Sequence, residues 1–160
     1  WQKSLNLPIS QFYAGSVAAQ NPDKIVGGTQ DNGSLKSETG PLGWSQILGG
    51  DGFHVLVDPT NTNQLLAEWQ YCSEKSGLKR SVNNGASWFN TTGWVTADRY
   101  NWNTPIARGG PHPNVLLSGS FRVYRSTNGG AHRTPLMPKL DILETASWVR
   151  YAIRTGLVQP

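Results

Sequence analysis

The sequence predicts an all-β protein built from repeated four-stranded antiparallel units, and two recurring phrases carry that prediction. The first phrase joins a turn containing Asn or Pro to a short apolar run. It occurs at residues 21–28, 61–68 and 112–119. Recurrence at roughly 40 to 50 residues is typical of arrays in which each unit buries its faces against its neighbours. The chain is therefore expected to be a set of similar units.

The second phrase keeps its order relative to the first and occurs at residues 80–88 and 125–133. Its Asn-Asn-Gly and Asn-Gly-Gly cores supply the positive φ angles that a tight hairpin requires. The flanking residues alternate as they do in strands. Each unit is therefore expected to end in a β-hairpin.

Strand patterns fill the second unit most completely. The expected strands are residues 53–57, 64–70, 78–82 and 87–91 in the second unit, 104–107, 115–120, 122–125 and 131–134 in the third, and 12–18, 24–29 and a looser outer pair ending at 44–47 in the first. Four antiparallel strands in each repeat are typical of a β-propeller blade. The predicted fold is about three blades of an incomplete ring.

Residues 81–88 resemble the Asp-box, or BNR, pattern Ser-x-Asp-x-Gly-x-Thr-Trp, with Asn83 in the place of its Asp. In the last copy, Arg133 replaces the aromatic residue and is expected to pack less well. Residues 8–138 are similar to secreted BNR-repeat propellers of the sialidase-like, xyloglucanase-like and sortilin-like kinds. The resemblance implies the propeller fold and an extracellular or periplasmic location. That architecture hosts glycosidases, lectins and protein-binding domains alike.

The repeats suggest a division of the whole chain. The expected segments are the last strand of a preceding blade (1–7), three blades (8–48, 49–100 and 101–138) and a C-terminal tail (139–160). In the tail, a capping box at 141–144 and helically spaced apolar residues predict a short helix, the alternative being an irregular strand that closes the ring. Three blades do not close a propeller, which typically has 4 to 8. Another chain, or a second copy of this one, is expected to supply the missing blades.

Composition limits the classes of partner. The 14 Lys and Arg residues give a mild net charge of +4 and are scattered, unlike a nucleic-acid surface. No apolar run is long enough for a membrane-spanning helix. The single cysteine, Cys72, cannot form an internal disulfide. The three histidines are far apart in the sequence, so neither a metal site nor a cofactor is predicted.

One end of the blades is expected to form a ligand surface, because the loop entering the first strand of a blade and the connection between its second and third strands lie at the same end. The candidate ligand-binding residues are Gln30, Asn32, Glu68, Trp69, Gln70, Tyr71, Trp102 and Phe121. Amides and carboxylates suit sugar hydroxyls, and aromatic rings suit the apolar face of a pyranose. The alternative is structural: Gln30 and Gln70 bond between blades, and Trp69 and Trp102 fill the core there.

The predicted function is a binding or scaffolding module for a carbohydrate or a protein surface. One alternative is a glycoside hydrolase, in which Asp31 and Asp51 on neighbouring loops form the carboxylate pair that such chemistry requires, with Glu68 as a substitute acid. A second alternative is a sortilin-like peptide binder, which would use an exposed inner strand edge in the channel.

Overall fold

A computed structural model describes residues 10–41, 43–71, 78–93, 98–109 and 112–135. These residues form twelve strands and no helix. The strands are β1 (Ala14–Ala18), β2 (Asn21–Thr29), β3 (Gly33–Ser37), β4 (Trp44–Leu48), β5 (Gly52–Val57), β6 (Leu65–Trp69), β7 (Leu78–Ser81), β8 (Phe89–Asn90), β9 (Ile106–Gly109), β10 (His112–Gly119), β11 (Val123–Ser126) and β12 (Thr134–Pro135).

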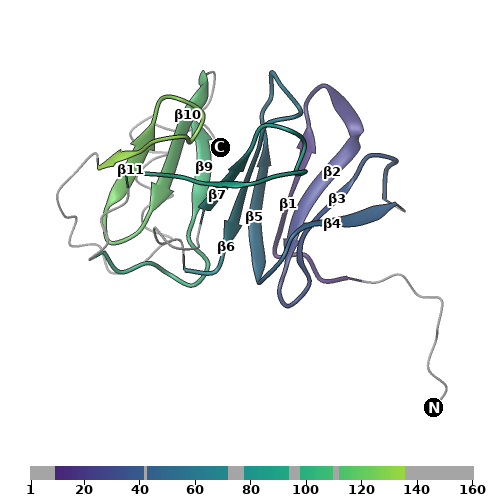
Figure 1. Ribbon diagram of the computed structural model, residues 1–160, viewed down its shortest axis with the longest axis horizontal. Coiled ribbons are helices and arrows are strands. Elements are labelled where there is room, and N and C mark those ends of the chain that lie inside the picture. The colour runs from purple at the N-terminus through teal and green to yellow at the C-terminus, as the bar shows by residue number, and fades with distance from the viewer. Residues whose placement is uncertain (1–9, 42, 72–77, 94–97, 110–111, 136–160) are drawn as a thin grey trace, which may run out of the picture.

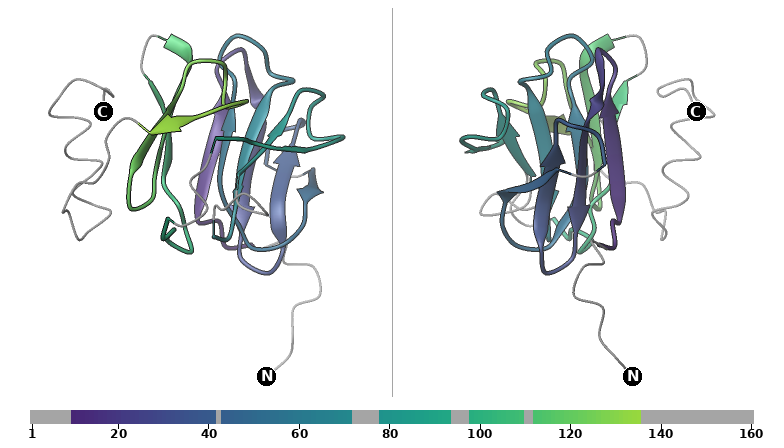
Figure 2. Two further views of the ribbon diagram at one scale, coloured as in Figure 1. Left: turned by 60° about the vertical axis from the view of Figure 1, so that its left-hand side comes forward. Right: turned by 90° about the vertical axis from the view of Figure 1, so that its right-hand side faces the viewer.

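The strands form three four-stranded antiparallel sheets, each ordered as its strands follow in the chain. We call them the first blade (β1–β4), the second blade (β5–β8) and the third blade (β9–β12). The blades lie side by side in chain order (Figures 1 and 2). This confirms the predicted fold class, an all-β chain of propeller blades in an incomplete ring. The strand predicted at 1–7 and the helix predicted in the 139–160 tail lie outside the described residues, and the blade boundaries remain predictions.

The turns between the third and fourth strands share one hydrogen-bonded design in the second and third blades. The Ser81 hydroxyl accepts the Gly85 N–H at 2.9 Å, and the Asn83 side-chain oxygen accepts the Ser87 N–H at 2.9 Å. In the third blade, Ser126 and Asn128 make the same two bonds, to the N–H groups of Gly130 and His132. The repeated phrase is therefore a side-chain-stabilised turn.

Strand register reveals a third version of this turn, which the sequence reading missed. Lys36 pairs with Ser45, Arg80 with Phe89, and Arg125 with Thr134. Trp44, Trp88 and Arg133 therefore occupy equivalent positions. The spacing from Ser37 to Trp44 equals that from Ser81 to Trp88 and could have revealed the copy.

Arg133 occupies the position equivalent to Trp88 and makes the same kind of hydrogen bond to its turn. The Trp88 indole N–H donates to the Gly85 carbonyl at 3.1 Å, and the Arg133 guanidinium donates to the equivalent Gly130 carbonyl at 3.3 Å. Arg133 is only 2% exposed. The expectation that this side chain packs poorly is therefore wrong, because the guanidinium both fills the space and satisfies the turn carbonyl.

Neighbouring blades are joined by two apolar clusters. Between the first and second blades lie Ala18, Val26, Val55, Val57, Leu65 and Ala67, with Ile47, Leu48 and Trp88 packed against them. Between the second and third lie Leu66, Leu78, Ile106, Leu116 and Tyr124, with Leu56 and Tyr100 packed against them. Successive residues of one strand thus face opposite sides of the sheet: Leu65 packs on the first blade, and Leu66 on the third.

Polar contacts reinforce these clusters at the end of the blades that carries the stabilised turns. The buried Lys24 ammonium donates to the Asn84 side-chain oxygen at 2.6 Å, joining the first blade to the second. Arg108 and Asp58 form an ion pair at 3.0 Å between the third blade and the second. Each blade boundary therefore combines an apolar interior with a polar contact at this end.

Shortening Leu65 to Ala should weaken the contact between the first and second blades. Leu65 is 1% exposed, and truncating such a side chain typically lowers the free energy of unfolding by about 2 to 5 kcal/mol. Urea denaturation measures the loss. The matched control is Val82→Ala, which should change stability by less than about 0.5 kcal/mol because Val82 is exposed. Equal losses in both variants would contradict the packing described here.

Candidate functional site

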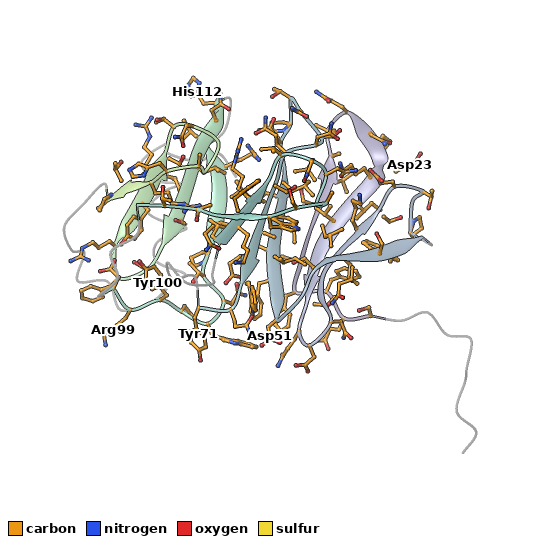
Figure 3. The ribbon with its side chains drawn as sticks, viewed as in Figure 1. Asp23, Asp51, Tyr71, Arg99, Tyr100 and His112 are labelled. Carbon is orange, nitrogen blue, oxygen red and sulfur yellow. The ribbon has the colours of Figure 1, made fainter. Side chains whose placement is uncertain are left out.

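The candidate site is the end of the blades opposite the stabilised turns. Figure 3 shows Asp51, Tyr71, Arg99 and Tyr100 at this end, and Asp23 and His112 at the other. We call it the loop end. It contains the β2–β3 and β10–β11 connections, the segment that precedes β5, and the described residues of the β6–β7 connection (70–71) and of the segment before β9 (98–105). The strand directions thus bring these connections to one end, as the sequence predicted.

A repeated hydrogen bond joins neighbouring blades at the loop end. The Asp31 N–H donates to the Asp51 side-chain oxygen at 2.9 Å, and the Tyr71 N–H donates to the Trp102 carbonyl at 3.0 Å. Asp31 and Tyr71 both have positive φ angles, 64° and 53°. This backbone conformation is uncommon away from glycine. At both boundaries, the turn of one blade is therefore held by the segment that enters the next.

Gln30 and Gln70 bond within their own blades. The Tyr13 hydroxyl donates to the Gln30 side-chain oxygen at 2.7 Å, and the Asp51 N–H donates to the Gln70 side-chain oxygen at 3.0 Å. Each glutamine thus anchors the segment before the first strand to the end of the second. The alternative in which these amides bond between blades is not what the structure shows. The sequence did not identify Tyr13 as the hydrogen-bond partner of Gln30.

Four candidate residues line the exposed surface of the loop end. Gln30, Asp31, Asn32 and Tyr71 are all exposed, and Tyr71 is 56% exposed. The Asn32 amide donates to the Gln30 carbonyl at 3.2 Å, and the Gln46 amide donates to the Asn32 carbonyl at 2.9 Å. Their backbone is therefore fixed while the side chains of Asp31 and Tyr71 face solvent.

The remaining aromatic candidates are partly enclosed. The Trp102 ring lies 4.6 Å from the Phe53 ring and 6.4 Å from the Tyr13 ring, so all three blades contribute to one aromatic cluster. Trp69 is half-buried with the Lys79 ammonium 5.3 Å from its ring centre, and the Arg99 guanidinium lies 5.1 Å from the Phe121 ring centre. Trp102 thus fills space between blades, in agreement with the structural alternative, and keeps part of its surface exposed.

Glu68 lies between the second and third blades, away from the exposed surface. It is 0% exposed, and its carboxyl accepts the Thr104 N–H at 3.1 Å. Burial raises its pKa to about 9, although the Thr104 and His54 backbone N–H groups partly oppose that rise. The carboxyl is therefore protonated at neutral pH.

Glycine occupies the place of Glu68 in the other two blades, at Gly28 and Gly119. A side chain on Gly28 would collide with the backbone of Gly52 and Phe53, so the first two blades approach closely there. Glu68 instead reaches the backbone of the third blade through its side chain, at the Thr104 N–H. Its burial was not evident from the sequence because it depends on the neighbouring blade.

A buried network that the sequence reading also missed fixes the third blade at the loop end. The Asp98 carboxylate accepts hydrogen bonds from the Tyr124 hydroxyl at 2.6 Å and the Ser120 hydroxyl at 2.9 Å, and it forms an ion pair with Arg122. Tyr100 and Tyr124 join hydroxyls at 3.3 Å. The Asp98 side chain is therefore a structural group that holds the segment before β9 against the β10–β11 connection.

Neither a cluster of metal-ligating residues nor a membrane-spanning helix is found among the residues that the structure describes. No group of three or more His, Cys, Asp or Glu residues is arranged there to hold a metal ion. None of the structured segments is a helix of the length and hydrophobicity needed to cross a bilayer.

Comparison with solved structures identifies the fold as a β-propeller. An ancestral GH74 enzyme matches 85% of this chain with a TM-score of 0.61 and 22% identity, and the GH74 enzyme of Niastella koreensis matches 76% with a TM-score of 0.55 and 25% identity. YCF48 from Cyanidioschyzon merolae matches 92% with a TM-score of 0.60 and 16% identity. The matches cover 19%, 17% and 43% of those chains, respectively.

Comparisons of the sequence assign no protein family to this chain. No protein-family model matches this chain, and no curated protein matches it. The propeller assignment therefore rests on the three four-stranded sheets and on their similarity to solved structures.

Glu68 should make stability depend on pH. Its pKa is about 9 in the folded chain and about 4.5 when exposed, so the folded state holds one more proton between those values. The free energy of unfolding should therefore fall as pH rises through this window, by at most about 1.4 kcal/mol per pH unit from this group. Urea denaturation across this pH range measures the slope.

The control for this prediction is Glu68→Gln, which keeps a side-chain carbonyl for the Thr104 N–H and cannot ionise. The variant should lose the part of the slope that Glu68 contributes. An unchanged slope in Glu68→Gln would contradict a protonated, buried Glu68.

Removing the Asp51 carboxylate should loosen the link to the first blade. Asp51→Ala deletes the acceptor of the Asp31 N–H and should cost about 0.5 to 1.5 kcal/mol of stability. Asp51→Asn keeps an acceptor oxygen and should cost less. Hydrogen exchange at the Asp31 amide checks the contact directly, and equal protection in the wild type and Asp51→Ala would argue against it.

Proposed function

We propose that this chain is part of a carbohydrate-binding β-propeller and that the loop end forms the binding surface. The observation that carries the proposal is the arrangement of Asp31, Asn32 and Tyr71, whose exposed side chains stand on a backbone fixed at both blade boundaries. Trp102 adds a half-buried ring beside them. Polar groups next to aromatic surface match the alternating hydroxyls and apolar ring faces of a saccharide.

Several contacts favour binding over hydrolysis. A glycosidase requires two carboxyl groups that are free to act on one bond. The Asp51 carboxylate already accepts the Asp31 N–H, and Glu68 is enclosed between blades. Asp31 keeps an exposed carboxylate for sugar hydroxyls. These contacts support a binding role in which Asp51 positions its neighbour.

A glycoside hydrolase remains the second candidate, because two of the similar structures are GH74 enzymes. In that candidate, Asp31 and Asp51 are the carboxylate pair. A protein or peptide ligand is the remaining alternative. The propeller belongs, in our proposal, to the BNR, or Asp-box, class, with an extracellular or periplasmic location and blades supplied by another chain or a second copy.

Replacing Tyr71 with Ala should weaken saccharide binding. Xyloglucan oligosaccharide is the probe, because residues 8–138 resemble xyloglucanase-like propellers. We expect the wild-type protein to bind it in isothermal titration calorimetry, and Tyr71→Ala to bind about tenfold more weakly, which corresponds to about 1.4 kcal/mol. The matched control is Phe89→Ala, an equally exposed aromatic on β8 that lies outside the loop end. Its affinity should equal that of the wild type.

The outcomes separate the candidates. Equal affinities of wild type and Tyr71→Ala, or no binding by the wild type, would overturn the proposed site. Release of reducing ends that disappears in an Asp31→Asn, Asp51→Asn double variant would establish the hydrolase instead.

A further inference from the structure

A lysine, an asparagine and a glutamate from two blades meet at the end of the blades opposite the loop end. The Lys24 ammonium of β2 donates to the Asn84 side-chain oxygen at 2.6 Å, and the Asn84 side-chain N–H donates to the Glu38 carboxylate at 2.8 Å. The same carboxylate oxygen, Oε1, lies 3.9 Å from the Lys24 nitrogen. An amine, a carboxamide and a carboxylate therefore form a closed triangle across the boundary between the first and second blades.

Lys24 is enclosed to a degree that is rare for lysine. It is 2% exposed, and its ammonium also donates to the Thr62 carbonyl. Burial lowers the pKa of the Lys24 ammonium, although the Glu38 carboxylate partly opposes that shift. A desolvated lysine loses its proton more readily, and the neutral amine is a nucleophile. The nearest electrophilic group is the Asn84 carboxamide, because its oxygen is the hydrogen-bond partner of the amine.

The Glu38 carboxylate is placed to carry a proton. The hydrogen bond from Asn84 is the main cause that lowers the pKa of Glu38, so this group is ionised at neutral pH. Its Oε1 atom lies beside both the Lys24 nitrogen and the Asn84 side-chain nitrogen. A carboxylate within reach of two nitrogens can take a proton from one and give it to the other. The Glu38 side chain is 47% exposed, so a small product released here has a path to solvent.

The boundary between the second and third blades lacks all three groups. The residues at the corresponding positions, assigned by strand register, are Gln64 for Lys24, Val82 for Glu38 and Gly129 for Asn84. A side chain on Gly129 would come within 3.9 Å of the Gln64 side-chain oxygen, so the two boundaries have similar geometry. Packing of one blade on the next therefore does not require this set of residues.

We propose that Lys24 and Asn84 form an isopeptide bond that joins the first blade to the second. The neutral Lys24 amine attacks the side-chain carbonyl carbon of Asn84, and Glu38 transfers a proton from the attacking nitrogen to the departing one. The Nζ–Cγ bond forms, the Cγ–Nδ2 bond breaks, and Nδ2 leaves as ammonia. A lysine ammonium and an asparagine amide thus become a new amide and an ammonium ion, with no oxidant or other reactant.

The bond would act as a covalent clamp on one blade boundary. Lys24 and Asn84 are 60 positions apart in the chain. A cross-link over such a separation closes a long loop and restricts the unfolded chain, which stabilises the folded state. This role is independent of the loop end, so neither proposal depends on the other.

The test is mass spectrometry of the full chain after incubation in the folded state. The denatured wild type should be lighter than its sequence predicts by the mass of one ammonia molecule. Trypsin should no longer cut after Lys24, and residues 4–36 should remain joined to residues 81–99. A wild type that keeps its full mass at every time point would overturn the proposal.

Three variants assign the roles. Lys24→Arg keeps a cation on β2 but removes the nucleophile, so it should keep its full mass. Glu38→Gln keeps the size of the side chain but cannot carry the proton, so it should form the cross-link about a hundredfold more slowly. The matched control is Lys36→Arg, which should react like the wild type because Lys36 donates to the Asn84 backbone carbonyl, at 3.1 Å, and not to its side chain. Thermal unfolding confirms that each variant is folded.

Loss of ammonia through the neighbouring glycine is the competing reaction. Attack of the Gly85 backbone nitrogen on the Asn84 side chain would give a cyclic imide, but the Gly85 N–H is held by the Ser81 hydroxyl at 2.9 Å. The imide would leave Lys24 open to trypsin and would form without Lys24. Loss of ammonia that persists in Lys24→Arg, or a cross-link that forms at the wild-type rate in Glu38→Gln, would therefore overturn the proposed reaction.

Discussion

Face-to-face packing of neighbouring blades is the interaction on which the rest of the structure depends. A four-stranded sheet has two faces, and alternate side chains of each strand serve one or the other. Leu65 and Leu66 of β6 illustrate this, since they join different clusters on opposite sides of the second blade. The contact between blades differs at equivalent positions: Gly28 permits close backbone approach, whereas the Glu68 side chain bonds to the Thr104 backbone. Each blade boundary therefore buries apolar side chains that an isolated blade would expose.

This constraint leaves the strand ends free of neighbouring blades, and the binding site that we propose lies at one of them. At one end, the side chains of Ser81, Asn83 and Lys24 are engaged in holding turns and boundaries. At the loop end, the contact between Tyr71 and Trp102 joins a backbone N–H to a backbone carbonyl and uses neither side chain. The side chain of Tyr71 is thereby left exposed on a fixed backbone. A rigid backbone with exposed polar and aromatic groups limits the conformational entropy lost on binding.

The sequence predicted what local chemistry determines. Asn-Gly turns, short apolar runs and their order were enough for the four-stranded units, because a hairpin depends on residues close together in the chain. The enclosure of Glu68, the intrablade bonds of Gln30 and Gln70, and the guanidinium of Arg133 in the place of an indole were not predictable in this way. Each depends on what the adjoining strand or blade presents, and no periodicity in the chain records that contact.

The most direct test of the division between packing faces and a binding end is a titration of isotope-labelled protein with xyloglucan oligosaccharide, followed by NMR. The account predicts that amide resonances of residues 30–33 and of Tyr71 shift on binding, while those around Asn84 and Val17 do not. Shifts centred on the turn that contains Asn84 or on the part of β1 around Val17, with the loop end unchanged, would contradict it.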